Sequence, residues 1–195
     1  MKRISEKLTK YVIKAGVVSE ELFEVYQYGF QIGLEILSCF TTCLMISIYL
    51  KVIPEFIIFT VSFMLLRTYG GGFHLNSFGA CFVCSIFVQT AILLFNNKYQ
   101  FSDESAWCII IVSSIFICKL APVENINREL DEVEKVHCKR MTMKIVVILL
   151  IFTAFCTFSR NNTIVSLIAI TTFVVFISQC IGMLKYNMSR NSNGK

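Results

Sequence analysis

Six apolar segments separate the charged parts of this chain, and they restrict the folds that it can adopt. They cover residues 28–50, 54–66, 78–95, 106–121, 145–159 and 163–184. Hydrophobic residues make up 55% of the 195 residues, charged residues only 16%, and the mean hydropathy is +0.67. An average soluble domain carries about 25% charged residues. Because a bilayer offers no partners to backbone polar groups, apolar segments cross it as helices. The sequence therefore predicts an all-α, polytopic membrane helix bundle with about six apolar segments.

A charged leader, residues 1–27, precedes these segments. Ile4 and Leu8 follow helical spacing while lysines occupy another face, a pattern typical of a helix that lies on an anionic membrane surface. The charges continue through the leader and no short apolar core with a cleavage site follows, so we expect no cleavable signal peptide. We predict an amphipathic helix in this leader and a single transmembrane helical domain over residues 28–195.

The distribution of lysine and arginine predicts the orientation in the membrane. If six spans start from a cytoplasmic N-terminus, fifteen of the eighteen basic residues fall on the cytoplasmic side. The other side then holds only Lys51, Lys98 and Arg160. Loops rich in lysine and arginine stay in the cytoplasm. We therefore expect both termini, the loop after the second apolar segment and the charged 122–144 loop to be cytoplasmic.

That first loop, from Arg67 to Cys81, carries the residue types of a catalytic site. It holds three consecutive glycines at positions 70–72, followed by His74. Consecutive glycines indicate a sharp bend or a close approach of the backbone. A thiol attacks carbonyls as a thiolate, and an imidazole can deprotonate it. On one straight helix His74 and Cys81 would lie about 10 Å apart along the axis. The pair therefore requires His74 in a loop that folds back over the start of the third apolar segment, with Cys81 in its first turn.

Other residues around this pair have more than one interpretation. The planar fork of Arg67 suits a substrate carboxylate or an oxyanion, although a topology anchor would also place an arginine there. The amides of Gly70, Gly71 and Gly72 are candidate oxyanion donors. Glu35 lies inside the first apolar segment, and intramembrane carboxylates are candidates for function. It could orient His74 as a third catalytic member, pair with Arg67, or reach toward water.

Two further interpretations compete with a peptidase. Cys84 lies three residues after Cys81, and this C-x-x-C pair fits a membrane thiol–disulfide oxidoreductase. The charge bias argues against that activity, because it places both thiols in a reducing compartment. A small non-enzymatic transporter is the other interpretation, but it leaves the Gly-Gly-Gly-Phe-His sequence unexplained.

The charged loop and the remaining cysteines are further candidates for binding sites. Lys135, Lys139 and Arg140 fit either a solvated helix with a membrane anchor or a site for an anionic substrate, and His137 fits a surface histidine. Most of the nine cysteines lie in apolar runs, where free cysteine is a packing residue. Two histidines without a tight Cys/His cluster predict no metal site.

The order of an arginine, a glycine run and His-x6-Cys resembles the accessory gene regulator protein B (AgrB) family of bacterial membrane cysteine endopeptidases. The charged leader, the six apolar segments and the charged loop opened by Ala121-Pro122 extend the resemblance over most of the chain. Family members process AgrD-like precursors of quorum-sensing peptides. The chain differs in having Phe73 before the histidine and three glycines instead of two.

The resemblance implies a reaction and its partners. Cys81 would attack the scissile carbonyl and release the acidic C-terminal tail, with His74 as general base and then acid. The acyl-enzyme thioester would pass to a Cys or Ser of the peptide, which closes a thiolactone or lactone ring. The expected partners are an AgrD-like precursor and the lipid bilayer of a bacterial cell membrane, with a homo-oligomer left open. We expect no cofactor and no nucleic acid.

Overall fold

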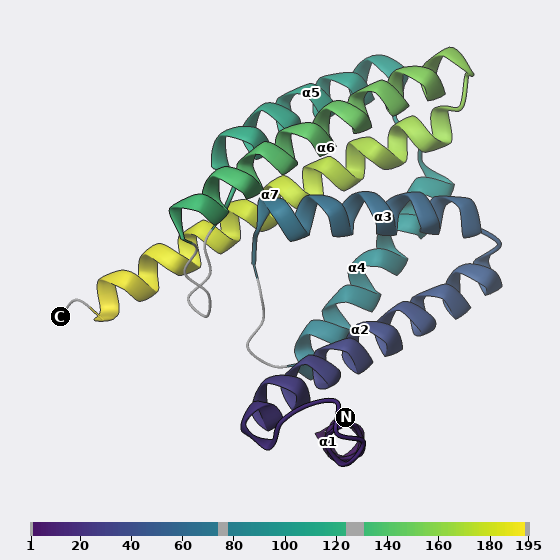
Figure 1. The fold of residues 1–195 in the computed structure, drawn as a ribbon. Helices are drawn as coiled ribbons and strands as arrows, with labels where there is room; N and C mark the ends of the chain where they lie inside the picture. The colour runs from purple at the N-terminus through teal and green to yellow at the C-terminus, as the bar shows by residue number, and fades with distance from the viewer. Residues whose placement is uncertain (1, 74–77, 124–130, 194–195) are drawn as a thin grey trace. The chain divides into compact units, whose positions relative to one another are not determined.

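The computed structural model describes residues 2–73, 78–123 and 131–193, and this part of the chain is helical and contains no strand (Figure 1). The elements are α1 (Lys2–Lys14), the 3-10 helix η1 (Glu20–Leu22), α2 (Phe23–Leu50), α3 (Ile53–Gly70), α4 (Phe78–Lys98), α5 (Asp103–Leu120), α6 (Glu132–Phe158) and α7 (Asn162–Asn193). The prediction of an all-α protein is confirmed.

Five helical segments among the described residues are long and apolar enough to cross a membrane. They are Glu20–Leu50, Ile53–Gly70, Gly79–Lys98, Glu132–Phe158 and Asn162–Met188. The helix α5 has the same length as α3, 18 residues, and its charged residues lie in its first and last turns. The second apolar segment is too short for a span by itself, but α3 continues beyond it to Gly70. The chain is a polytopic membrane protein.

The chain forms two compact units. The first comprises Met1–Lys51 and Asn76–Thr90, and therefore α1, η1, α2 and the first part of α4. In α1, Ser5 and Thr9 are buried and their hydroxyls donate to backbone carbonyls of the same helix. Ile4 and Leu8 are exposed, so α1 is the amphipathic helix that the sequence predicts.

The second unit comprises Val52–Leu75 and Ala91–Lys195, and α7 is its central helix. It runs along α5 and α6, and α3 lies against α6 and α7 (Figure 1). Val165, Ile168 and Ala169 of α7 are buried in one apolar cluster, and Val175 is buried in a second. Small buried residues along α7 let the neighbouring backbones approach closely, as in other membrane bundles.

The charged segment 122–144 is only partly a loop. The helix α6 begins at Glu132, and the Asp131 side chain caps it by accepting a hydrogen bond from the Glu132 N–H at 2.7 Å. Lys135, Lys139 and Arg140 therefore lie on the first turns of α6. Residues 124–130 lie outside the described part of the chain.

Candidate active site

The three consecutive glycines lie where α3 ends. Gly71 and Gly72 have φ angles of +73° and +139°, which L side chains rarely adopt. The position of a Gly71 side chain is occupied by the backbone of Val123, whose N–H donates to the Gly70 carbonyl at 3.0 Å. The predicted bend and close backbone approach are both present. We call the residues Gly70–Phe73 the glycine loop.

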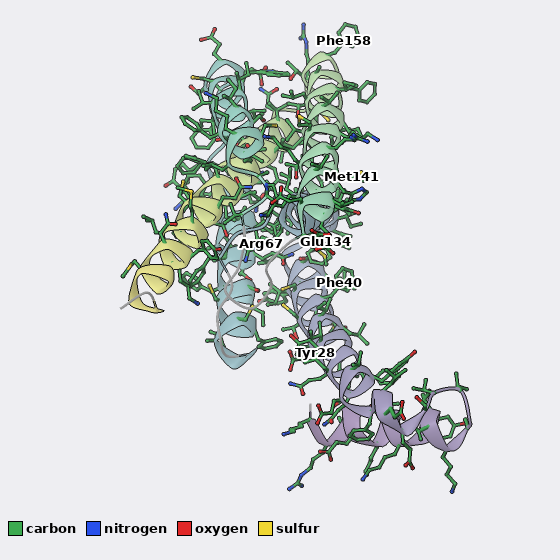
Figure 2. The ribbon with its side chains drawn as sticks, turned by 60° about the vertical axis from the view of Figure 1, so that its left-hand side comes forward. Tyr28, Phe40, Arg67, Glu134, Met141 and Phe158 are labelled. Atoms are coloured by element: carbon green, nitrogen blue, oxygen red, sulfur yellow. The ribbon has the colours of Figure 1, made fainter. Side chains whose placement is uncertain are left out.

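The glycine loop is bound to α7 through Phe73. The Phe73 N–H donates to the Ser178 carbonyl at 3.0 Å and lies 3.3 Å from the Ser178 Oγ. Arg67, which is labelled in Figure 2, lies in the last turn of α3. Its two terminal nitrogens donate to the Ser178 Oγ and to the Phe73 carbonyl oxygen. Both polar groups of the Phe73 backbone are therefore fixed by protein contacts.

Three more residues of α7 contact the same loop. The buried Gln179 donates from Nε2 to the Gly70 carbonyl at 2.9 Å. A Cβ atom on Gly182 would lie 2.8 Å from the Gly72 carbonyl carbon and 2.9 Å from the Phe73 nitrogen. The Lys185 Nζ lies 5.1 Å from the centroid of the Phe73 ring. We call Ser178, Gln179, Gly182 and Lys185 the α7 docking face, because their spacing places them on one side of the helix.

These contacts give Arg67 and Gly71 structural tasks at the end of α3, and the attachment of Arg67 to α7 was not predicted from the sequence. The guanidinium of Arg67 binds the glycine loop to α7. The Gly71 N–H donates to the Arg67 carbonyl at 3.1 Å and so ends α3. The roles of Arg67 and the glycine amides in binding a substrate or an oxyanion stay predictions.

Cys81 is the fourth residue of α4 and lies in its first turn, as predicted. The first four N–H groups of a helix lack intrahelical acceptors, and this end of the helix favours a negative charge such as a thiolate. Cys81 is half-buried, whereas Cys84 is exposed. His74, the other predicted catalytic residue, lies outside the described residues.

Three residues of α2 in the first unit share one face of the helix, and one of them interacts electrostatically with Cys81. This residue is Cys39. Glu35 precedes Cys39 by one helical turn and so lies on the same face. Its Oε1 accepts a hydrogen bond of 3.0 Å from the Gln31 Nε2. The sequence analysis named Glu35 but not Gln31 or Cys39. The three residues are successively four positions apart, which places them on one face of a helix.

The basic residues of α6 belong to the unit that holds the glycine loop. Lys139 and Arg140 are exposed, and the Lys135 Nζ forms an exposed ion pair with Glu132 at 3.0 Å. His137 is exposed and its ring centroid lies 6.3 Å from that of Tyr69, the residue before the glycines. The start of α6 therefore lies beside the end of α3.

The fold and these residues define a polytopic membrane protein with a half-buried thiol at a helix start and a separately fixed glycine loop. The family model of accessory gene regulator B matches residues 5–183, so the chain belongs to the AgrB family, which takes part in the processing of quorum-sensing peptides and acts with AgrD-type precursors.

Two curated relatives come from Clostridium perfringens. The chain is 23% identical over 158 residues to an AgrB-like protein of strain 13, and the matched region covers 77% of this chain and 74% of that protein. It is 25% identical over 157 residues to an AgrB-like protein of strain SM101, and the matched region covers 76% of this chain and 72% of that protein. No solved structure matches the chain significantly.

Proposed function

We propose that the chain is a membrane cysteine endopeptidase that removes the acidic C-terminal tail of an AgrD-type precursor and allows the remaining peptide to cyclise. The observation that carries this proposal is the position of Cys81, half-buried in the first turn of α4, in a member of the AgrB family. A thiol at a helix start is suited to act as a thiolate nucleophile.

The reaction begins when His74 takes the proton of the Cys81 thiol. The thiolate adds to the scissile carbonyl carbon, and collapse of the tetrahedral intermediate breaks the C–N bond. The imidazolium gives its proton to the leaving amine, and the tail departs while the peptide stays attached to the Cys81 Sγ as a thioester. His74, neutral again after this transfer, takes the proton of a thiol or hydroxyl of the bound peptide as that group attacks the thioester. The ring closes, and Cys81 leaves as the thiolate beside the imidazolium.

Ring closure requires no ATP if water stays away from the thioester. Exchange of a thioester between two thiols forms a bond of the same type as it breaks, whereas hydrolysis would waste the intermediate. A site enclosed by apolar helices excludes water from the intermediate. Two apolar segments support this arrangement, Ile53–Gly70 before Cys81 and Gly79–Lys98, which contains it.

Other residues are proposed to assist the two catalytic ones. Glu35 is the candidate for the group that orients His74, and its place on the Cys39 face of α2 supports this role. Lys139 and Arg140 are exposed on α6 and suit the acidic tail of the precursor, as does Lys135. The excess of lysine and arginine on one side of the six-span topology supports a cytoplasmic location for both termini and for the active site, in a bacterial cell membrane.

The test is the release of the tail from an AgrD-type precursor by the chain in proteoliposomes. We expect Cys81→Ala to abolish release and Cys84→Ala to retain most of it. A thiol–disulfide oxidoreductase would need both cysteines and would release no tail. Equal loss of activity in the two variants, with equal expression, would therefore contradict the peptidase assignment.

A further inference from the structure

We propose that Ser178, Gln179 and Gly182 of α7 are positioning residues of the reaction, because they hold the glycine loop at a fixed point from which the chain continues into His74. The inference rests on the proposed function and adds to it a part of the chain more than 100 residues away from the glycine loop. It makes α7 a component of the catalytic apparatus and not only a membrane span.

The first argument is that the backbone of Phe73 is bound on both sides. Its N–H donates to the Ser178 carbonyl at 3.0 Å, and its carbonyl accepts from Arg67. The same guanidinium donates to the Ser178 Oγ. His74 is joined to that Phe73 carbonyl by a peptide bond. Arg67 and Ser178 thus hold the backbone of the residue that precedes the proposed base.

The second argument is that three different kinds of contact converge on four consecutive residues. Ser178 binds Phe73 through hydrogen bonds, and Gln179 binds the Gly70 carbonyl through its amide. Gly182 contributes the absence of a side chain, since a Cβ there would lie 2.8 Å from the Gly72 backbone. Hydrogen bonds at Gly70 and Phe73, together with the close fit of Gly182 against Gly72, hold the loop in one register along α7.

The third argument is the free-energy cost of burying the polar side chain of Gln179. Gln179 is fully buried in a helix that is long and apolar enough to cross a membrane. Its Oε1 has no hydrogen-bond partner among the described residues, which is unfavourable in an apolar surrounding. An apolar residue would fill the same space without this cost. The side chain is therefore explained by the hydrogen bond that its Nε2 makes to the glycine loop.

Loss of this support should affect the chemical step more than substrate binding. A displacement of about 1 Å of a catalytic group can lower the rate about 100-fold. We expect Ser178→Ala and Gly182→Ala each to lower kcat about 10- to 100-fold and to leave KM within about twofold. Ser178→Thr keeps the hydroxyl and should restore most of the activity.

The experiment measures kcat and KM for tail release from an AgrD-type precursor in proteoliposomes. The matched control for the serine is Ser166→Ala on the same helix, whose Oγ accepts a hydrogen bond of 3.1 Å from the Phe101 N–H, far from the loop. The matched control for the glycine is Gly33→Ala, where an added Cβ meets nothing within 4 Å. Both controls should keep kcat within about twofold of the wild-type value, because neither touches the glycine loop.

A second measurement separates positioning from loss of the fold. The rate of Cys81 alkylation by iodoacetamide at neutral pH should fall in Ser178→Ala, because a displaced imidazole no longer generates the thiolate. An unfolded variant would be alkylated faster. Faster alkylation, or a kcat equal to that of Ser166→Ala, would overturn the positioning role.

The failure of this inference and that of the proposed function give different results. If Cys81→Ala still releases the tail, the proposed function is wrong whatever Ser178→Ala does. If Cys81→Ala is inactive while Ser178→Ala and Ser166→Ala have equal kcat, the peptidase stands and only the positioning role is lost.

Discussion

The glycine loop offers a prediction whose magnitude follows from the geometry. At Gly71 the φ of +73° is unfavourable for alanine by about 1–2 kcal/mol. The new Cβ would also overlap the Val123 backbone, which must move and weaken its hydrogen bond to the Gly70 carbonyl, a bond with a net contribution of about 0.5–1.5 kcal/mol. We therefore expect Gly71→Ala to lower the free energy of unfolding by about 2–3 kcal/mol.

The neighbouring glycine should be less sensitive. A Cβ at Gly70 would lie 2.8 Å from the Gln179 Nε2, the end of a side chain, and its backbone has no positive φ. Gly33→Ala is the control, since it lies in α2 with open space around it, and alanine is favoured over glycine in a helix by about 0.5–1 kcal/mol. From the most to the least stable, the expected order of the variants is Gly33→Ala, Gly70→Ala and Gly71→Ala.

A thiol-reactive dye measures this order in detergent, because unfolding exposes the buried Cys43 and Cys156. At a fixed scan rate the apparent Tm of Gly71→Ala should fall by roughly 4–12 °C, given about 2–4 °C for each kcal/mol in a chain of this size. An apparent Tm for Gly71→Ala equal to that of Gly33→Ala would refute the close approach of residue 123 to the glycine loop.

Two further predictions concern topology and the base. Reporters fused after Lys51, Lys98 and Arg160 should all be located outside the cell, because the basic residues concentrate on the opposite side; a cytoplasmic signal at Lys98 would contradict the six-span topology. Replacement of His74 by alanine should abolish tail release while His137→Ala keeps most of it, since His137 is an exposed residue that contacts Tyr69; equal losses with unchanged expression would show that the roles are wrongly assigned.

The sequence predicted the helical class and the local features of the motif, because both depend on short-range patterns. Apolar runs identified the helices, and three glycines in a row indicated the bend that the φ angles of Gly71 and Gly72 show. The second apolar segment, residues 54–66, is shorter than the helix α3 that contains it, because Arg67 and Gly70 continue the helix without being apolar.

The contacts between distant segments could not be predicted from the sequence. Ser178 is 105 residues from Phe73, and Gln179 is 109 residues from Gly70. A serine and a glutamine in an apolar span have many other interpretations, so no local pattern pairs them with the glycine loop. The electrostatic interaction of Cys39 with Cys81 is likewise a tertiary feature, because the two residues lie on different helices of the first unit.

The covalent intermediate tests the central claim most directly. An AgrD-type precursor whose cyclising cysteine is replaced by alanine cannot close its ring, so the acyl-enzyme should accumulate. Intact-mass spectrometry should then show the chain with the peptide attached, and hydroxylamine should remove the added mass because it cleaves thioesters. The adduct should be absent from Cys81→Ala and present in Cys84→Ala. An adduct that persists in Cys81→Ala, or tail release by the wild-type chain without any hydroxylamine-sensitive adduct, would contradict catalysis by Cys81.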